Sequence, residues 1–416
     1  RYGYNQGLVD NLYDVYPLSK NPTLPGILTA HGYQTRAQGK MHFAPLRANS
    51  GFEHMELPME YYRERRLYPE GGLPKEHGVG ENEVEPVIST VDEVHSLTHW
   101  TVRRSIEFLE TRDDTRPFFL WTSFTKPHPP FDPCANYWAL YQNAEIPSPV
   151  LGDWSEDIHS MPQGLLASTY SLSNMYRLSE KQQENVRRAY YACITQIDYS
   201  LGLLFARMRE LGLLKNTWII FTSDHGDMQG DHHMGGKSVF LEGSAHVPMI
   251  VCPPEGVDIP GLSAGSRYDG LVAVADIMPT FLNLAGAVIP EHVDGMDLLG
   301  QASNGSTNRI LFGNSCDRYY AVIGSRYKYM WCKAGGAEQL FDLEKDPMEQ
   351  HELIAAGTHR ETAQSMRGQL IEFLEKQNNP AVCTGELVTG PALSGPEAVG
   401  KWPGLISTQF PCDVLH

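Results

Sequence analysis

Apolar residues recur along the chain at two different spacings, which predict helices in some stretches and strands in others. The clearest helix is expected at 186–211, where apolar side chains return every three or four positions. Unbroken apolar runs at 118–124 and 218–223 predict strands buried on both faces. The same reasoning predicts these further elements: strands at 33–37 and 247–251, and helices that begin at Thr23, cover 102–109 and run from Asp276 to Leu284. This alternation indicates an α/β fold, with a mixed, mostly parallel sheet sandwiched by helices.

A different pattern begins near residue 304. Short apolar stretches follow one another with Gly and Asn turns and no helix between them, which is typical of a small antiparallel sheet. Its strands are expected at 309–312, 320–323 and 328–331, and a helix at 361–377 is expected to pack on them. We therefore predict three parts: a main α/β domain at 1–303, a smaller C-terminal sheet plus helix at 304–380, and a wrapping tail at 381–416.

The charge of the chain limits the partners that it can bind. Its 416 residues include 50 acidic and 33 basic ones, so the formal net charge is -17. This charge repels nucleic acid and anionic membranes, and no apolar run approaches the roughly 20 residues that span a bilayer. We expect no nucleic-acid partner and no membrane span, whereas a homo-oligomer stays open. An anionic substrate would need a local cationic site that overcomes this overall field.

The cysteines carry little information about function. There are 7 of them, an odd number without a CxxC pair, which argues against a disulfide framework or a zinc ribbon. Cys193, in a predicted helix, and Cys252, at the end of a predicted strand, are expected to be small buried apolar residues. Free cysteines slightly favour the cytoplasm, while a periplasmic or secreted location stays open.

Polar residues of related kinds follow three of the predicted strands. Ligands of open α/β sheets bind beyond the carboxyl ends of the strands, so side chains at these ends are expected to converge. Lysines and histidines beside an Asp-His pair suit a tetrahedral oxyanion next to a divalent metal ion. The residues are Lys40 and His42, Lys126 and His128, and Asp224 and His225, with Lys237 a few positions further on.

Each of these residues also has an ordinary explanation when it is taken alone. Lys40 fits a solvated lysine, and His128 fits a stiff proline-rich loop. The run 224–227 fits an Asx turn at the end of a strand. Lys126 is interpreted mainly as structural. The triplet 231–233, Asp-His-His, adds possible metal ligands, although adjacent histidines rarely point to one centre.

Several motifs, in this order and at these separations, resemble those of the formylglycine-dependent sulfatases of the alkaline phosphatase superfamily. A glycine-lysine-x-histidine run follows a GYxT strand, a Pro-His-Pro-Pro segment follows an apolar strand, and a Ser-Asp-His-Gly-Asp segment precedes a Gly-Lys pair. The likeness extends over most of residues 1–380. The matching segments are Gly32 to Thr35 with Gly39 to His42, Pro117 to Phe131, Ser223 to Lys237, Glu242 to Pro248, and Leu340 to Pro347.

The resemblance implies a divalent metal cofactor and a formylglycine made from Cys or Ser. Asp224 and His225 would ligate the metal. Ca²⁺ is the first expectation, and Mg²⁺ or Mn²⁺ stays open because calcium prefers oxygen ligands and His225 supplies nitrogen.

The resemblance also implies roles for the cationic residues. Lys40 and His42 would contact the formylglycine hydrate and the sulfate. His128 and Lys237 would bind sulfate oxygens, and either one would assist the leaving alcohol. Attack at sulfur shifts negative charge onto the leaving oxygen, so fixed cations aimed there stabilise the transition state more than the ground state.

One part of the family pattern is missing from the sequence. The nucleophile segment, C-x-P-S-R or S-x-P-x-R, does not occur. Arg1-Tyr2 resembles the residues that follow this segment, so we expect the formylglycine, and a first strand with two metal aspartates, upstream of Arg1. Without that part, the chain alone is expected to expose an edge of the central sheet and to lack full turnover.

The leading hypothesis is a sulfuric ester hydrolase that cleaves an aryl or carbohydrate sulfate. Two alternatives stay open: a phosphodiesterase or phosphonate monoester hydrolase of the same superfamily, and a sulfatase-like binding protein without a nucleophile. The run Gly39 to His42 favours sulfate. Candidate specificity residues are His95, His99, Arg103, Arg104 and His246, although the two arginines also fit a solvated helix face.

Overall fold

A computed structural model gives the fold of the chain. It describes residues 22–43, 45, 47–65, 83–162, 164–165, 175–305 and 308–391. The helices are α1 (Leu24–Ala30), α2 (Pro58–Glu64), α3 (Leu97–Thr111), α4 (Ala135–Tyr141), α6 (Glu180–Glu210), α7 (Glu242–Ala245), α8 (Ile277–Leu284), α9 (Leu298–Ser303) and α10 (Arg360–Lys376). The strands are β1 (Gln34–Gly39), β2 (His54–Glu56), β3 (Phe118–Ser123), β4 (Ile219–Thr222), β5 (Met249–Cys252), β6 (Leu311–Ser315), β7 (Tyr319–Ile323), β8 (Tyr327–Cys332), β9 (Glu338–Asp342), β10 (Val382–Cys383) and β11 (Glu386–Leu387).

The first sheet is parallel. Thr23 caps α1, because its side chain accepts a hydrogen bond from Gly26 N at 3.2 Å. Gly32, at φ 86°, then lets the chain turn from α1 into β1. β1 lies between β2 and β3 and runs parallel to both, with Gly39 opposite Ser123. β1 and β3 therefore deliver the residues that follow them to the same edge of the sheet.

The next two strands form a sheet of their own. β4 pairs with β5 in antiparallel orientation, so the mixed α/β sheet is divided into two parts within the described residues. The prediction of strands buried on both faces is wrong, since Trp121 is 42% exposed and Phe221 is 39% exposed. Among the described strands, β3 pairs only with β1 and β4 only with β5. Side chains on such edge strands have fewer neighbours to cover them.

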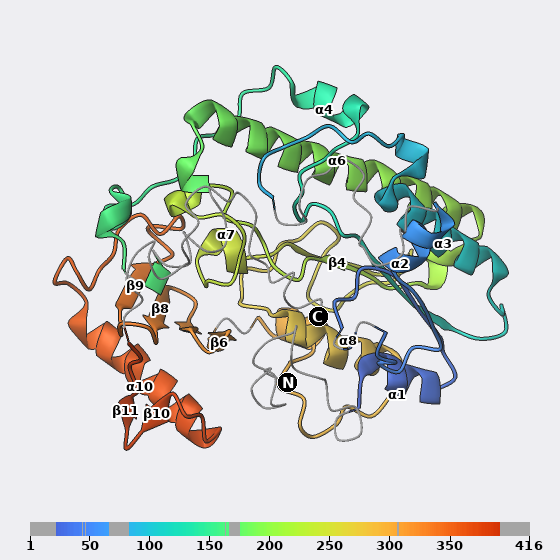
Figure 1. The fold of residues 1–416 in the computed structure, drawn as a ribbon. Helices are drawn as coiled ribbons and strands as arrows, with labels where there is room; N and C mark the ends of the chain where they lie inside the picture. The colour runs from blue at the N-terminus through green and yellow to red at the C-terminus, as the bar shows by residue number, and fades with distance from the viewer. Residues whose placement is uncertain are drawn as a thin grey trace.

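Helices cover both sides of these strands, as the predicted sandwich requires. α6 begins at the Ser179 cap, ends before Gly212 at φ 69°, and packs with α3 and α4 (Figure 1). Leu204 of α6 shares one buried cluster with Phe118 of β3 and Ile219 of β4. On the other side, α1 and α8 pack together with Phe119 of β3. None of the helices in the described ranges combines the length and apolar character that a bilayer crossing requires.

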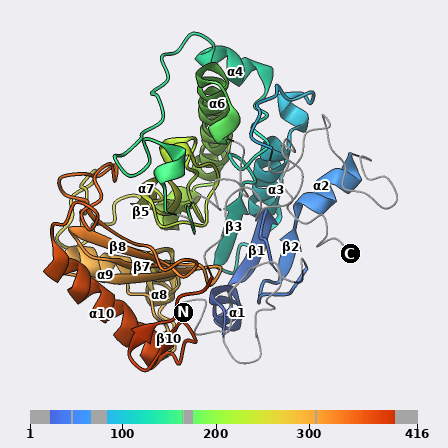
Figure 2. The ribbon, with the colours of Figure 1, turned by 60° about the vertical axis from the view of Figure 1, so that its left-hand side comes forward.

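The C-terminal sheet has the order β6-β7-β8-β9 and is antiparallel throughout, which confirms the prediction. α10 covers one face through Leu370 and Leu374, which pack on Tyr320 and Trp331 (Figure 2). The other face packs on the chain between α6 and α7, through side chains such as Met330. This sheet is therefore built against the main domain.

Two smaller expectations have different outcomes. Cys193 is buried in α6 as expected, but Cys252 is exposed because it stands at the end of the edge strand β5. In the expected tail, β10 and β11 form a short hairpin that contacts α10. The rest of that tail, from 392 to 416, lies outside the described residues.

Candidate active site

The carboxyl ends of β1 and β3 bring Lys40 and His128 to one edge of the first sheet. Lys40 N donates a hydrogen bond to Ser123 O at 3.0 Å, which continues the β1–β3 pairing by one residue. Gly39 has φ 96°, and a Cβ there would lie 1.9 Å from the same carbonyl oxygen. The turn to Lys40 therefore requires glycine. His42, two residues further on, also has a left-handed backbone, with φ 51°.

Lys126 has partners within the loop that follows β3. Its ammonium group donates to Pro130 O at 2.6 Å and forms an ion pair with Asp132. His128 N also donates to Thr125 O at 3.1 Å. These contacts close the proline-rich loop after β3 and fix the backbone that carries His128.

His128 and Lys237 form the central contact of the site. The Nζ of Lys237 lies 2.6 Å from Nε2 of His128, and Nδ1 of His128 lies 2.8 Å from Pro129 O. The geometry fits one tautomer, in which Nδ1–H donates to the carbonyl and Nε2 accepts from the ammonium group. The fold thus brings into contact two side chains that are 109 positions apart in the sequence.

The pKa values of these two groups follow from burial and from nearby positive charge. Burial, followed by the charges of Lys237 and Lys40, lowers the pKa of His128 to about 2. Burial, followed by the charge of Lys40, lowers the pKa of Lys237 to about 8, while Asp227 and Asp224 oppose the shift. At neutral pH the pair consists of a neutral imidazole and an ammonium group with a weakened hold on its proton. Such a lysine is suited to donate a proton to a leaving oxygen.

His42 belongs to the same electrostatic environment. Desolvation of the ring is the largest cause that lowers the pKa of His42, and the charges of Lys40 and Lys237 lower it further. The residue as a whole is exposed. Asp224 acts in the opposite direction. The lysines after β1 and before α7 therefore act on one small region, which provides the local positive charge that an anionic ligand would need.

Asp224 and His225 follow β4 and provide two donors that fit a metal ion. His225 Nδ1 lies 2.7 Å from Gly226 O, so this nitrogen carries the proton and leaves the Nε2 lone pair available. Nε2 lies 3.5 Å from a carboxylate oxygen of Asp224, whose side chain is 70% exposed. A nitrogen and an oxygen at this separation suit one shared divalent ion. Groups of three or more potential ligands are not found within the described ranges, so further ligands would have to come from elsewhere.

The imidazole rings of His225 and His128 connect the two parts of the site. Their centroids are 6.1 Å apart at an interplanar angle of 66°. Burial is the largest cause that lowers the pKa of His225, and Asp224 opposes it. The site therefore joins residues that follow β1, β3 and β4, as the rule for strand ends predicts.

Asp227 organises the loop between His225 and Lys237, a role that the sequence did not reveal. Its Oδ1 accepts hydrogen bonds from Gln229 N at 3.0 Å and from Gly236 N at 3.1 Å. Because Gly236 precedes Lys237, this carboxylate fixes the backbone at the lysine. The only indication of this role in the sequence was that the run 224–227 fits an Asx turn.

Asp231 and His232 are held by partners outside the Asp224–His225 pair. The carboxylate of Asp231 pairs with Arg187. The ring of His232 is buried, stacks on Trp154 at 4.5 Å and lies 2.9 Å from Ser155 Oγ. These two residues have structural partners, so their role is to hold the loop.

The two arginines among the candidate specificity residues, Arg103 and Arg104, form ion pairs with acidic residues. Arg104 forms ion pairs with Glu56 at 3.5 Å and with Glu107 at 2.6 Å, and Arg103 contacts Glu64 at 3.2 Å. These partners belong to β2, α2 and α3, which makes a surface ion-pair network. This arrangement agrees with the alternative explanation of a solvated helix face.

The three histidines proposed for specificity differ in their surroundings. His95 ends a short 3-10 helix, and its carbonyl accepts the hydroxyl of Tyr61 at 2.8 Å. His99 is in the first turn of α3 and is partly buried. His246 directly follows α7, and its Nδ1 lies 2.6 Å from a carboxylate oxygen of Glu242. Their roles in substrate choice stay predictions.

The fold and this site define a class of protein: an α/β enzyme with a cationic anion site and metal-compatible donors at the strand ends. The sulfatase family model matches residues 1–287. A second model, N-sulphoglucosamine sulphohydrolase, C-terminal, matches residues 230–376. The chain therefore belongs to the sulfatase family of the alkaline phosphatase superfamily, whose members are enzymes that hydrolyse sulfate esters.

Individual relatives agree with this assignment. An arylsulfatase from Clostridium perfringens is 30% identical over 423 residues, which cover 95% of this chain and 85% of that protein. A choline-sulfatase from Rhizobium meliloti is 32% identical over 359 residues, covering 80% of this chain and 67% of that protein.

Solved structures share the fold. The phosphonate monoester hydrolase of Agrobacterium radiobacter has a TM-score of 0.74 at 24% identity, covering 90% of this chain and 84% of that chain. A protein solved in complex with D-glucosamine-2-N,6-O-disulfate has a TM-score of 0.67 at 20% identity, covering 91% and 86%. The predicted alkaline-phosphatase-like architecture is thus confirmed.

Proposed function

We propose that this sulfatase cleaves an aryl or carbohydrate sulfate monoester at a catalytic site formed by Lys40, His42, His128 and Lys237. The observation that carries the proposal is the contact between Lys237 and His128, beside His42 and the Asp224–His225 pair. A sulfate monoester has one negative charge spread over several oxygens, and this site is the region of concentrated positive charge at the strand ends.

The cationic residues have complementary tasks in this proposal. Lys40 and His42 hold the sulfate at the end of β1. Lys237 donates a hydrogen bond, and finally a proton, to the bridging oxygen as the alcohol leaves. Neutral His128 keeps Lys237 aimed at that oxygen, because its Nε2 accepts from the ammonium group. Such fixed donors lower the barrier most where negative charge develops.

Two further groups complete the proposed site. A divalent cation, calcium first and otherwise magnesium or manganese, would be held by Asp224 and His225 and would supply positive charge to the sulfate oxygens. A formylglycine hydrate would supply the nucleophilic oxygen.

The proposal is tested by measuring the rate of sulfate ester hydrolysis by the full-length protein, purified either with or without a chelator. We expect hydrolysis of 4-nitrophenyl sulfate, loss of activity on chelation, and recovery with one of the three cations. Turnover unaffected by prolonged chelation would contradict the metal assignment. Absence of turnover on aryl and sugar sulfates in every metal-loaded sample would contradict the proposal itself.

A phosphonate monoester hydrolase is the second candidate. The observation in its favour is the fold shared with the Agrobacterium radiobacter enzyme, together with an Asp-His pair that suits phosphoryl and sulfuryl groups alike. Turnover of phenyl phosphonate esters should be measured beside that of aryl sulfate. A kcat/KM that is higher for the phosphonate would reverse our order of the two functions.

A sulfated saccharide is our preferred natural substrate. The neighbour that binds a glucosamine disulfate supports it, and so does the match to the C-terminal region of N-sulphoglucosamine sulphohydrolase. A panel of sulfated sugars, assayed with the His95→Ala, His99→Ala and His246→Ala variants, tests the choice. Unchanged selectivity in all three variants would remove these histidines from substrate recognition.

A further inference from the structure

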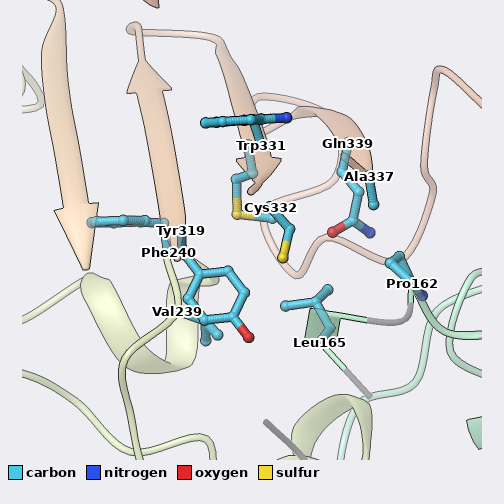
Figure 3. A pocket seen from close by; sticks show the side chains of 10 residues that line it. Pro162, Leu165, Val239, Phe240, Tyr319, Trp331, Cys332, Ala337 and Gln339 are labelled. Atoms are coloured by element: carbon cyan, nitrogen blue, oxygen red, sulfur yellow. The ribbon is translucent and has the colours of Figure 1, made fainter. Parts of the chain in front are cut away.

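One face of the C-terminal sheet packs on the chain from 224 to 246, which we call the site segment because it contains Asp224, His225 and Lys237. Figure 3 shows Val239 and Phe240 of this segment beside Tyr319 and Cys332 of the sheet. The cavity there has room for no more than about one water molecule. The buried cluster at this contact consists mainly of Met228, Met234, Val239 and Leu241 from the segment, and Tyr319, Ala321, Met330, Cys332 and Phe341 from the sheet.

A lysine is buried in this otherwise apolar contact. Lys328 lies in β8 on the same face as Met330, because side chains alternate along a strand. It is 1% exposed, and its Nζ contacts a carboxylate oxygen of Glu242 and, at 2.9 Å, one of Glu349. Transfer of an ammonium group from water to such a position costs several kcal/mol unless it is paired. The two carboxylates provide that pairing, and they come from two different parts of the chain.

The same ion cluster holds the beginning of α7. Glu242 is the first residue of α7, and its backbone N–H donates to Glu349 Oε2 at 2.7 Å. Glu349 is held in turn by Trp154, whose Nε1 donates to its carbonyl at 2.7 Å. Burial raises the pKa of Glu242, but its hydrogen bond with His246 and the charge of Lys328 outweigh this and lower it to about 2. Glu242 therefore stays ionised and paired with the lysine.

α7 is in direct contact with the backbone of the metal donors. Ser244 O accepts a hydrogen bond from Gly226 N at 2.8 Å. A Cβ at Gly226 would lie 2.2 Å from Gly243 O, so the two backbones approach as closely as glycine permits. Gly226 directly follows His225, and any shift of α7 would therefore move the Asp224–His225 pair.

A second set of hydrogen bonds connects Asp227 and Met228, just after Gly226, to the backbone beside Lys237. Met228 N donates to Gly236 O at 2.8 Å, and Gly236 N donates to the Asp227 carboxylate at 3.1 Å. Gly236 precedes Lys237. The metal donors and Lys237 are thus fixed to one loop, and that loop is fixed to α7.

We propose that Lys328 is a positioning residue of the active site: through Glu242 and Glu349 it anchors α7 and thereby sets the positions of Asp224, His225 and Lys237. The C-terminal sheet accordingly takes part in catalysis without touching the substrate. The catalytic consequence rests on the proposed function, whereas the mechanical coupling does not.

The test is Lys328→Met in the full-length protein, with amide hydrogen exchange as the first readout. We expect faster exchange at Gly226, Gly236 and Glu242, beyond the change in the rest of the chain. With aryl sulfate we expect kcat to fall about tenfold or more, the range found when residues that orient metal ligands are removed. We expect a smaller change in KM, because the substrate-binding groups remain present.

The matched control is Arg326→Met. Arg326 lies two residues before Lys328 and pairs with Asp342 at 2.7 Å, and none of its described contacts reaches the site segment. This variant should lose stability without selective exchange in the segment and with kcat retained.

A second variant keeps the test decisive where Lys328→Met does not fold. Glu349→Gln keeps the shape of the side chain but weakens the contact with Lys328, so the same amides should exchange faster to a smaller extent. If exchange in the segment follows only global stability in both variants, or if Arg326→Met gives the same pattern, the proposal is wrong. If the wild-type protein lacks sulfatase turnover, the proposed function fails, and hydrogen exchange still decides the anchoring role.

Discussion

At the scale of single residues, the contact between His128 and Lys237 determines which group can move a proton. His128, with a pKa of about 2, stays neutral at any pH at which the enzyme would work, so it is an acceptor for Lys237 rather than an acid. Lys237, with a pKa of about 8, is protonated at neutral pH and can release its proton. In the proposed mechanism the two side chains therefore function as one unit.

This pairing predicts how two substitutions combine. Lys237→Met and His128→Ala should each lower kcat/KM for aryl sulfate by about 100-fold or more, the scale of general acid catalysis. The double variant should lose much less than the product of the two single effects, because either change already disrupts the unit.

The measurement is kcat/KM from steady-state kinetics on the wild-type protein, the two single variants and the double variant. Lys376→Met is the control, since Lys376 is exposed on α10 and pairs only with Glu372 among its described contacts. Fully additive losses would show that the two side chains act independently.

A second residue-scale prediction concerns stability and pH. Burial lowers the pKa of His232 from the usual 6.5 to about 4. The unfolded chain therefore takes up a proton at this residue below pH 6.5, while the folded chain does so only near pH 4. The free energy of unfolding should consequently fall by up to about 3 kcal/mol as the pH drops through this range.

Urea unfolding at several pH values checks this expectation. His232→Gln should show a shallower dependence between pH 6.5 and 4 than the wild-type protein. Identical slopes would mean that another group controls the acid response.

At the scale of elements, the junction after β1 decides where Lys40 and His42 lie. Gly39 needs a left-handed backbone and has no room for a Cβ, since that atom would lie 1.9 Å from Ser123 O. Gly32 needs a similar backbone, φ 86°, but a Cβ there would meet nothing within 4 Å. A substitution at Gly32 would therefore add backbone strain alone, whereas a substitution at Gly39 would add both backbone strain and a steric clash.

Alanine substitutions at the two glycines should differ accordingly. Gly32→Ala should lower the free energy of unfolding by about 1–2 kcal/mol through strain alone. Gly39→Ala should lower it by about 1–3 kcal/mol more, because β1 and β3 must also separate, and turnover should fall as Lys40 moves. Denaturant unfolding and kinetics on both variants provide the comparison, and equal effects would contradict the clash.

At the scale of the whole molecule, the C-terminal sheet is packed against the main domain. The buried cluster and Lys328 join them next to the site segment. Among the described strands, β3 pairs only with β1 and β4 only with β5, so the two small sheets are not joined by a described strand.

The amino-acid sequence was enough to predict most of the elements and the kinds of side chain available to the candidate site. The spacing of apolar residues predicted α6, α8 and three of the four strands of the C-terminal sheet, because local periodicity sets which face of an element is buried. It did not predict β9. Motifs at the ends of β1, β3 and β4 identified Lys40, His128 and Asp224, since strand ends carry ligand-binding residues in such sheets.

Which of these residues lie in contact could be learned only from the folded chain. The contact of Lys237 with His128, the structural partners of Lys126, and the ion cluster of Lys328 all join positions far apart in the chain. Exposure of Trp121 was decided in the same way, by the absence of a strand beside β3 among those described. Burial and pairing depend on neighbours brought by the fold, and a sequence pattern contains only the neighbours along the chain.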